Sequence, residues 1–361
     1  MRRRDVIKLS FAGMGYLCAG CGRRRAKEKV KTATPASPPP HPPPPPPPVW
    51  AGLVFPTEQQ GLLEPGREDV FQPTAAGTRK SALYGSVRTA NRGGRLMASF
   101  HEGIDIAPVR RDRQGRPLDE VLAVAEGKVA YVNKVAGNST YGKYVVVEHD
   151  DPMGVVYTLY AHLADTAVMR GDAVTPGHVL GLMGNTATYS IPMSRAHLHF
   201  EVGVMLNSRF DRWYDGQKLK PSHGLCHGWN LLGVDPLDFI DRQRTDKRLK
   251  FDDVLAATAV AFELVIKAES MPDYFRRYTS RWRGEPFKGG SLTVGFSENG
   301  VPLWGRVAEE AEAALIIKGR AAVVAAEKEV LGRNGARLVL PSGTDWSVGA
   351  SGAKRVELLL Y

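Results

Sequence analysis

Short runs of β-branched and aromatic residues, separated by turn residues, dominate residues 82–204 and predict β-strands. Tyr144–His149 and Val155–His162 are two such runs. The turn-forming residues 150–154 between them predict that these two strands form a hairpin. No stretch of this region has a helical period of useful length, so the pattern favours an all-β domain.

Two further patterns in the same region predict strands. Val121–Val132 consists of two apolar runs broken at Glu126-Gly127, which predicts a second hairpin. Val179–Met183 follows a Pro-Gly turn and predicts another strand.

The clearest strand is Ala196–Val204, where polar and apolar residues alternate. His197, His199 and Glu201 fall on one face, and the other face is wholly apolar and is predicted to pack on a core. Alternate residues of a strand lie about 6.5 Å apart. One imidazole can therefore bind a metal ion while its neighbour points at whatever the metal holds, although a His-x-His pair alone is weak evidence for such a site.

The C-terminal third, residues 250–361, is predicted to be an α+β region, and its sequence indicates no function. Phe251–Glu269 is almost continuously apolar and predicts a buried core helix, too short and too charged to span a membrane. A second helix is expected over Glu309–Ile317. Short strands are expected over Ser291–Phe296, Val301–Arg306, Arg337–Leu340 and Arg355–Tyr361.

The charge of the chain is concentrated at its N-terminus. Of the net charge of +10, residues 1–31 contribute +8, because ten Lys and Arg residues stand against Asp5 and Glu28. The other 330 residues are close to neutral, so no basic surface for a nucleic acid is expected. Of the three cysteines, Cys18 and Cys21 precede the folded part, and Cys226 alone excludes a disulfide framework there.

Residues 1–21 are predicted to be an export signal, with a basic start and an apolar run of about a dozen residues that is too short for a membrane span. The end of this run, Cys18-Ala19-Gly20-Cys21, resembles a bacterial lipobox, which implies lipidation of Cys21 and a membrane anchor. Arg3-Arg4 also resembles a twin-arginine signal. An ordinary secretory signal with an incidental cysteine is the alternative.

Residues 22–49 form a basic and proline-rich tether, with eleven prolines between Pro35 and Pro48. As a polyproline II helix at about 3.1 Å per residue, this segment would be a stiff spacer of roughly 40 Å. A low-complexity linker without a required length is the equally weighted alternative.

A second cluster of chemistry-bearing residues is His101-Glu102-Gly103-Ile104-Asp105. A helical His-Glu zinc motif with Glu102 as the base is one reading, but Gly103, the isoleucines and Pro108 oppose a helix. In a fully extended chain His101 and Asp105 would lie about 13 Å apart, too far to share an ion. We therefore expect Gly103 to bend the segment and bring the two side chains together. Two histidines and an aspartate suit a catalytic zinc site with an open fourth position.

Three separated motifs together resemble the lysostaphin/LytM-type zinc metalloendopeptidases: His101-x-Gly103-x-Asp105, Tyr160-Ala161-His162-Leu163 and His197-Leu198-His199-Phe200-Glu201. The resemblance covers residues 82–204, with a similar tail near residue 240, and departs at an insertion around Val109–Leu118. It implies a mainly β catalytic domain over 82–240, whose antiparallel sheets form a groove through a duplicated hybrid motif.

Carried over to this chain, the resemblance implies that His101, Asp105 and His199 bind one Zn²⁺ and that His162 and His197 move protons beside it. Glu102 is then not needed as a base, and Glu201 is expected to support the site. The implied activity is hydrolysis of peptide bonds in peptidoglycan cross-links or stems. The alternatives are a non-catalytic module that binds cell wall or activates another hydrolase, and a lipid-anchored structural stalk.

The expected partners and location follow from these readings. Peptidoglycan peptides are the expected substrate, the membrane is contacted through Cys21, nucleic acid is not a partner, and the protein is exported to the periplasm or cell envelope. The remaining histidines are expected to be structural or solvated. They are His41, His149 and His178, and the cluster His223, Cys226 and His227, which lacks an obvious fourth ligand.

Overall fold

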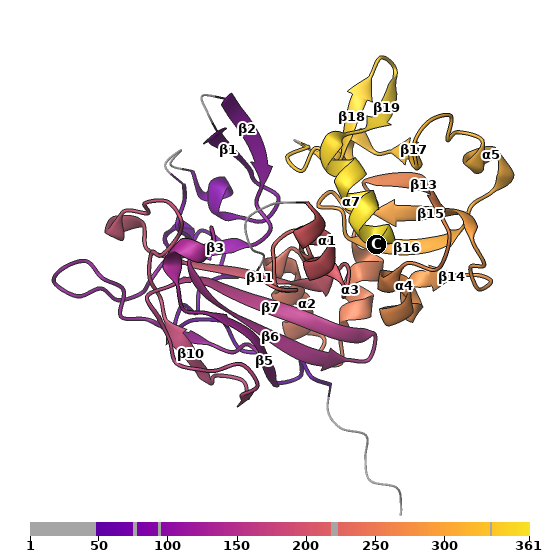
Figure 1. Cartoon of the computed structure of the whole chain (residues 1–361). Helices are drawn as coiled ribbons and strands as arrows, with labels where there is room; N and C mark the ends of the chain where they lie inside the picture. Colours follow the sequence, from indigo (N-terminus) through magenta and orange to yellow (C-terminus); the bar gives the residue numbers. More distant parts are fainter. Residues whose placement is uncertain (1–47, 75–77, 93–94, 218–222, 333) are drawn as a thin grey trace, which may run out of the picture. The chain divides into compact units, whose positions relative to one another are not determined.

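The computed structural model describes residues 48–74, 78–92, 95–217, 223–332 and 334–361 (Figure 1). The predicted signal with Cys21, almost all of the predicted tether and His41 lie outside these residues. Among the described residues, no helix combines the length and apolar character that crossing a membrane requires.

A seven-stranded, largely antiparallel sheet forms the centre of the β-rich region and appears as long adjacent ribbons in Figure 1. Its order is β12 (Leu231–Val234), β11 (Leu198–Met205), β7 (Gly154–Leu163), β6 (Lys143–Asp151), β5 (Gly127–Asn133) and β9 (Ala173–Val174), with β3 (Ile104–Ile106) paired to β11.

Two strands of this sheet match their predictions closely. β6 and β7 form the predicted hairpin, with Asp151 paired to Gly154 at its turn. On β11, the predicted apolar face is fully buried, from Leu198 to Val204. This strand lies between β7 and both β3 and β12, so it brings the three motifs together in one sheet.

The predicted hairpin within Val121–Val132 is wrong. The strand β4 (Glu120–Leu122) pairs with β10 (Val179–Leu182) in a separate three-stranded sheet that also contains β8 (Asp165–Thr166), whereas β5 pairs with β6 and β9. Ala123, Val124 and Ala125 between β4 and β5 are fully buried, and Val124 N–H donates to the Tyr160 hydroxyl at 3.0 Å. The chain therefore crosses from one sheet to the other instead of reversing.

Residues 48–72, for which the sequence indicated no structure, pack into the same core. Trp50 is completely buried, its Nε1–H donates to Asp151 Oδ2 at 2.8 Å, and its carbonyl accepts a hydrogen bond from Gln243. Phe71 forms a bridge with Ile106 of β3. A two-stranded ribbon, β1 (Val87–Arg92) with β2 (Arg95–Phe100), follows.

The C-terminal region has its own five-stranded sheet, in the order β14 (Trp282–Arg283), β16 (Pro302–Val307), β15 (Gly290–Phe296), β13 (Phe262–Ala268) and β17 (Ala321–Ala326). The predicted strands Ser291–Phe296 and Val301–Arg306 correspond to β15 and β16. A mainly β domain followed by an α+β region is therefore confirmed. The remaining strands, β18 (Val339–Ser342) and β19 (Asp345–Val348), form a hairpin, the first of them beginning two residues after the predicted start at Arg337.

The single helix predicted over Phe251–Glu269 is wrong. Only α3 (Phe251–Ala257) is helical, and after a short connection most of the remaining run is β13. β13 lies between β15 and β17 and is mostly buried. A strand buried on both faces is continuously apolar, and its pattern cannot be told from that of a buried helix.

The strand predicted over Arg355–Tyr361 is also wrong, since these residues belong to α7 (Ala350–Leu360). Gly349 is the N-cap of this helix, so the helix begins ahead of the apolar run. Gly352 packs so closely on the Leu338 carbonyl that a Cβ would lie 2.0 Å from its oxygen. The helix predicted over Glu309–Ile317 is shortened to α5 (Glu310–Ala313). The other helices are α1 (Phe210–Gly216), α2 (Pro236–Thr245), α4 (Asp273–Arg277) and α6 (Lys328–Leu331).

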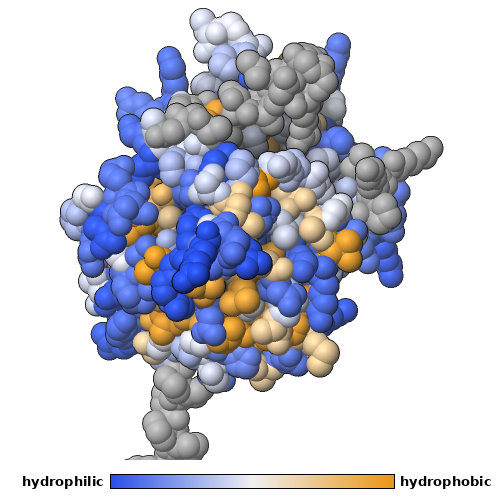
Figure 2. All heavy atoms as spheres, turned by 90° about the vertical axis from the view of Figure 1, so that its left-hand side faces the viewer, coloured by the Kyte–Doolittle hydropathy of each residue, from blue (hydrophilic) through white to orange (hydrophobic). Residues whose placement is uncertain are grey.

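The described part of the chain from residue 48 onward belongs to one unit, Pro46–Tyr361. Hydrogen bonds join its β-rich and C-terminal regions: Asn207 Nδ2–H donates to the Leu358 carbonyl at 2.8 Å, and the Tyr278 hydroxyl donates to the Val155 carbonyl at 2.7 Å. On the face drawn in Figure 2, apolar side chains show as patches among hydrophilic ones.

Candidate metal centre and its histidines

The segment from His101 to Asp105 bends at Gly103 and then enters β3. The bend brings His101 Nε2 to 3.1 Å from Asp105 Oδ1, although four residues separate them in the sequence. Gly103 is needed for a close approach and not for a left-handed φ: a Cβ there would lie 2.3 Å from the Phe200 carbonyl oxygen. Gly103 therefore bends the segment as expected, but the reason that a glycine is needed is the close approach to Phe200 and not a left-handed backbone.

β11 presents His199 to the same pair. His199 is directly opposite Asp105 in the register of β11 and β3. Its Nδ1 lies 3.0 Å from Asp105 Oδ1 and 3.1 Å from His101 Nε2. These three side chains are the one group of at least three His, Cys, Asp or Glu residues, within the described ranges, whose ligand atoms come together in this way.

Protein acceptors on the far side of each ring fix which nitrogen faces the centre. Nδ1–H of His101 donates to the Leu83 carbonyl at 2.9 Å, and Nε2–H of His199 donates to Glu201 Oε1 at 2.8 Å. The inward nitrogens, His101 Nε2 and His199 Nδ1, are therefore the ones left to bind a metal ion. Glu201 also accepts from the Tyr141 hydroxyl at 2.8 Å, so its expected supporting role has a concrete geometry.

The charges around His199 favour a cation at the centre. Burial by itself lowers the pKa of His199, but hydrogen bonds to Asp105 and Glu201 and the charges of these two carboxylates outweigh burial and raise the pKa to about 9. The residues of the centre are only 2% to 5% exposed, so little water screens these charges. The same two carboxylates would stabilise any positive charge bound at Nδ1.

His162 reaches the centre from a distorted part of β7. Its φ of 63° is left-handed, which is rare for a residue other than glycine, and the pairing of β6 with β7 shifts register at this point. The Tyr141 carbonyl accepts from His162 N–H at 2.9 Å, and the Thr186 carbonyl accepts from its Nδ1–H at 2.8 Å. Local strain is thus held in place by two backbone contacts, as at many functional sites.

His197 precedes β11 and is held by the turn before it. Its Nδ1–H donates to the Arg195 carbonyl at 2.7 Å, and its Nε2 lies 3.6 Å from Asp105 Oδ1. The rings of His162 and His197 are 4.8 Å apart, centre to centre. Burial, followed by the charges of His197 and His199, lowers the pKa of His162 well below its usual value, so this ring is neutral at pH 7.

The insertion around Val109–Leu118 contacts the turn that carries His197. Arg111 donates to the carbonyls of Met193 at 2.8 Å and of Ser194 and Ala196 at 3.3 Å each. These residues surround the short 3-10 helix Met193–Arg195. The sequence indicated the insertion but not this contact. It also gave no sign that the backbone carbonyls of Tyr141 and Thr186 hold His162, because a backbone acceptor is not visible in the residue type.

The other chemistry-bearing residues lie outside the centre. Glu102 lines a separate cavity, as expected for a residue that does not act on the metal. His149 is fully buried, with Nδ1–H donating to the Glu126 carbonyl at 2.7 Å and Nε2 accepting from Thr158. His178 is exposed. Cys226 is a buried free thiol whose pKa is raised to about 12 by burial, and it forms no metal group with His223 and His227.

The donor set fits a zinc ion. Zinc binds histidine nitrogen and carboxylate oxygen at about 2.0–2.1 Å, which places tetrahedral ligand atoms roughly 3.3 Å from one another. The three separations found between His101, Asp105 and His199, 3.0 to 3.1 Å, are close to that value. Three protein donors with second partners for both histidines are typical of a catalytic site.

The model of a known family, peptidase family M23, matches residues 99–213. The chain carries a peptidase family M23 domain. All five residues of the centre, His101, Asp105, His162, His197 and His199, lie within it. The fold and the family therefore agree with the resemblance that the three motifs indicated.

Two curated relatives each match less than a third of the chain. An uncharacterized metalloprotease of Haemophilus influenzae is 36% identical over 105 residues, which is 29% of this chain and 18% of the relative. The cell division protein DipM of Caulobacter vibrioides is 39% identical over 104 residues, 28% of this chain and 14% of the relative. The chain thus spans less than a fifth of the length of these relatives.

Solved structures similar to the chain include two peptidases. The catalytic domain of lysostaphin from Staphylococcus simulans is 23% identical with a TM-score of 0.28, and covers 44% of this chain and 89% of its own. A zinc-containing peptidase from Vibrio cholerae is 25% identical with a TM-score of 0.23, and covers 37% of this chain and 35% of its own.

Proposed function

We propose that the protein is a zinc-dependent endopeptidase that hydrolyses peptide bonds in the cross-links or stems of peptidoglycan. The observation that carries the proposal is the convergence of His101 Nε2, Asp105 Oδ1 and His199 Nδ1 within 3.0–3.1 Å, with two further histidines beside them. A module that had lost catalysis would be expected to lack some of these five residues, and all five are present and assembled.

In this proposal His101, Asp105 and His199 hold one Zn²⁺. The bound ion would supply Lewis acidity, which lowers the pKa of a water molecule and polarises a peptide carbonyl. Glu201 fixes the orientation of the His199 ring, and the Leu83 carbonyl fixes that of His101.

The proton transfers of hydrolysis belong to His162 and His197. Both rings donate Nδ1–H to a backbone carbonyl, so both are held in the tautomer whose Nε2 accepts a proton. A ring that has taken a proton at Nε2 can then donate it to the leaving amine or stabilise the developing oxyanion. The low exposure of both rings keeps bulk water from competing for these protons.

The proposal also includes the class of substrate and the location of the protein. Peptidoglycan peptides are supported by the three lysostaphin/LytM-type motifs and by the M23 domain. Export, and a membrane anchor at Cys21, are supported by the sequence of residues 1–21 and by the spacer that follows. An anchored enzyme with a spacer of periplasmic length favours direct stem-peptide cross-links over glycine bridges.

The deciding experiment incubates the purified full chain with peptidoglycan of defined cross-linking and measures the products by mass. New amine termini should appear, vanish with a zinc chelator, return when zinc is restored, and be absent with His199→Ala. His178→Ala is the matched control, because His178 is exposed and should leave the products unchanged.

Intact peptides at saturating zinc would contradict the proposal. If the protein still sediments with the insoluble wall in that case, the alternative is favoured, a module that binds wall or activates another hydrolase. Mixing the protein with a separate wall hydrolase would then test for activation.

A further inference from the structure

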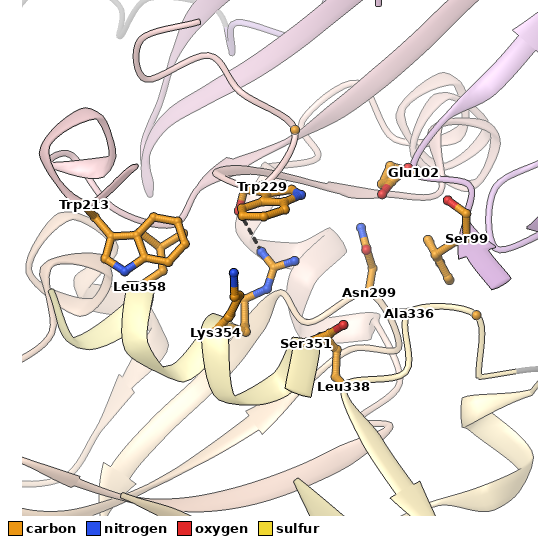
Figure 3. Close-up of a pocket in the computed structure, with 14 residues that line it drawn as sticks. Ser99, Glu102, Trp213, Trp229, Asn299, Ala336, Leu338, Ser351, Lys354 and Leu358 are labelled. Atoms are coloured by element: carbon orange, nitrogen blue, oxygen red, sulfur yellow. Dashed lines mark hydrogen bonds between the residues drawn. The ribbon is translucent and has the colours of Figure 1, made fainter. Parts of the chain in front are cut away.

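A cavity of about 230 Å³ lies next to the metal centre but on the other side of the His101–Gly103 segment, where Glu102 lines it (Figure 3). The C-terminal helix α7 forms its floor through Ser351, Lys354 and Arg355. Trp213 of α1 and Trp229 complete the wall opposite Glu102. Liquid water occupies about 30 Å³ per molecule, so the cavity has room for a small organic ligand.

One buried donor in this cavity is poorly satisfied. Asn299 is 3% exposed, and its Nδ2 makes no hydrogen bond of normal geometry among the described residues, although its side chain still acts on the Tyr84 hydroxyl. Figure 3 shows its amide pointing into the space between Trp229 and Glu102. A buried donor left unsatisfied costs about 1–3 kcal/mol, which a ligand with an oxygen acceptor would recover.

An acidic and a basic side chain line the same space without forming an ion pair. Arg355 and Glu102 both line the cavity and act on each other electrostatically. Among the described residues, neither takes part in an ion pair within 4.0 Å. Arg355 can therefore meet an anionic group of a ligand, and Glu102 can meet a cationic one.

The cationic side of the cavity is rigid. Arg355 donates one N–H to the Trp229 carbonyl at 3.0 Å, which fixes the guanidinium and leaves its other donors available. Lys354 lies over the Trp229 ring, 5.4 Å from its centre. The apolar part of the lining comes from Phe100, Leu338 and Leu358. Pre-positioned donors in an amphipathic cavity are typical of small-molecule sites.

We propose that this cavity binds a small zwitterion of the α-amino acid class with an apolar side chain. The carboxylate contacts Arg355 and Asn299 Nδ2, the ammonium group contacts Glu102, and the side chain packs on the apolar walls. The site is distinct from the proposed zinc centre and requires neither the ion nor peptidase activity.

The test uses leucine as the probe and isothermal titration calorimetry on the full chain, with and without a zinc chelator. Leucine should bind in both conditions. 4-Methylpentanoate, which lacks the ammonium group, and leucine methyl ester, which lacks the carboxylate, should each bind at least about tenfold more weakly. The unaltered protein decides this comparison, so it does not depend on the folding of any variant.

Variants locate the site. Asn299→Ala and Arg355→Gln should each weaken leucine binding about tenfold or more, whereas Arg320→Gln, an exposed arginine of the same region, should not. The proposal is overturned if leucine shows no binding up to about 50 mM. It is equally overturned if the singly charged analogues bind as tightly as leucine, or if both cavity variants bind normally.

Discussion

Glu201 Oε1 accepts a hydrogen bond from His199 Nε2 at 2.8 Å, and this contact determines that Nδ1 of His199 faces Asp105. The second contact of Glu201, from the Tyr141 hydroxyl, holds the carboxylate in place. The proposed metal ligand His199 is thus positioned by Glu201, two residues further along the same strand. Glu201 is in turn held by Tyr141, which lies outside that strand.

Replacing this carboxylate should weaken metal binding more than it weakens the fold. Glu201→Gln keeps the volume but removes the charge that faces His199, and partners of this kind are worth about 10- to 100-fold in metal affinity. Competition with a calibrated chelator would measure the change in zinc dissociation constant. Glu126→Gln, at an exposed glutamate, is the control, and equal affinities for the two variants would contradict the assigned role.

His162→Ala should retain zinc and lose turnover. His162 is not among the three grouped donors, so zinc content should stay at one ion per chain, while loss of a proton-transfer group typically lowers kcat by about 10²- to 10⁴-fold. Zinc content by elemental analysis and kcat on a cross-linked peptide would be measured together. Loss of both zinc and activity would instead place His162 among the ligands.

Arg111→Gln should reduce kcat through the position of His197. The variant loses the charged contacts to the carbonyls around the Met193–Arg195 turn, and a small displacement of a proton-transfer group costs up to about 100-fold in rate. Arg113→Gln, an exposed arginine of the same insertion, should leave kcat unchanged. A flattened pH–rate profile in Arg111→Gln alone would separate misplacement of His197 from general destabilisation; identical profiles in both variants would rule out the positioning role.

His149 should make the fold sensitive to acid. Burial lowers the pKa of His149 from 6.5 to about 4. Between these two pH values His149 is therefore protonated in the unfolded chain but neutral in the folded chain. The free energy of unfolding should therefore fall as the pH drops from 6.5 to about 4, by about 3 kcal/mol from this residue. Urea unfolding at a series of pH values would measure the slope.

The matched comparison for this acid sensitivity is between two variants. His149→Gln should show a shallower fall over this pH window than the unaltered protein, whatever its stability at pH 7. His178→Gln, at an exposed histidine, should show the same fall as the unaltered protein. A slope unchanged by His149→Gln would contradict the link.

The sequence predicted the centre better than the fold around it, and the reason is local. His197 and His199 alternate with apolar residues that pack on the core, so the face of the sheet they occupy was readable from the period alone. The bend at Gly103 was also readable, because His101 and Asp105 could not otherwise meet. What could not be read was the left-handed φ of His162, which depends on a register shift between two strands.

Errors in the fold came from patterns that two structures share. The apolar residues after α3 suit a buried helix as well as a central strand, and only pairing with β15 and β17 decides between them. The last residues of α7 look strand-like when they are read without the helical turn that precedes them. The contact of Arg111 could not be predicted for another reason. Its partners are backbone carbonyls about 80 residues away, and every residue carries such a carbonyl, so the sequence does not mark which ones are bound.

Trp50 should make the folded unit resist a pulling force applied to the chain before it. Its indole is bonded to Asp151 and its carbonyl to Gln243, and the ring lies among Phe239, Phe251 and His149 in the core. A pull on the chain ahead of Trp50 would therefore be resisted by the centre of the protein and not by a loose edge. The load would reach both the hairpin of β6 and β7 and the start of α3, so we expect the candidate metal centre to stay assembled under tension until the contacts of Trp50 break.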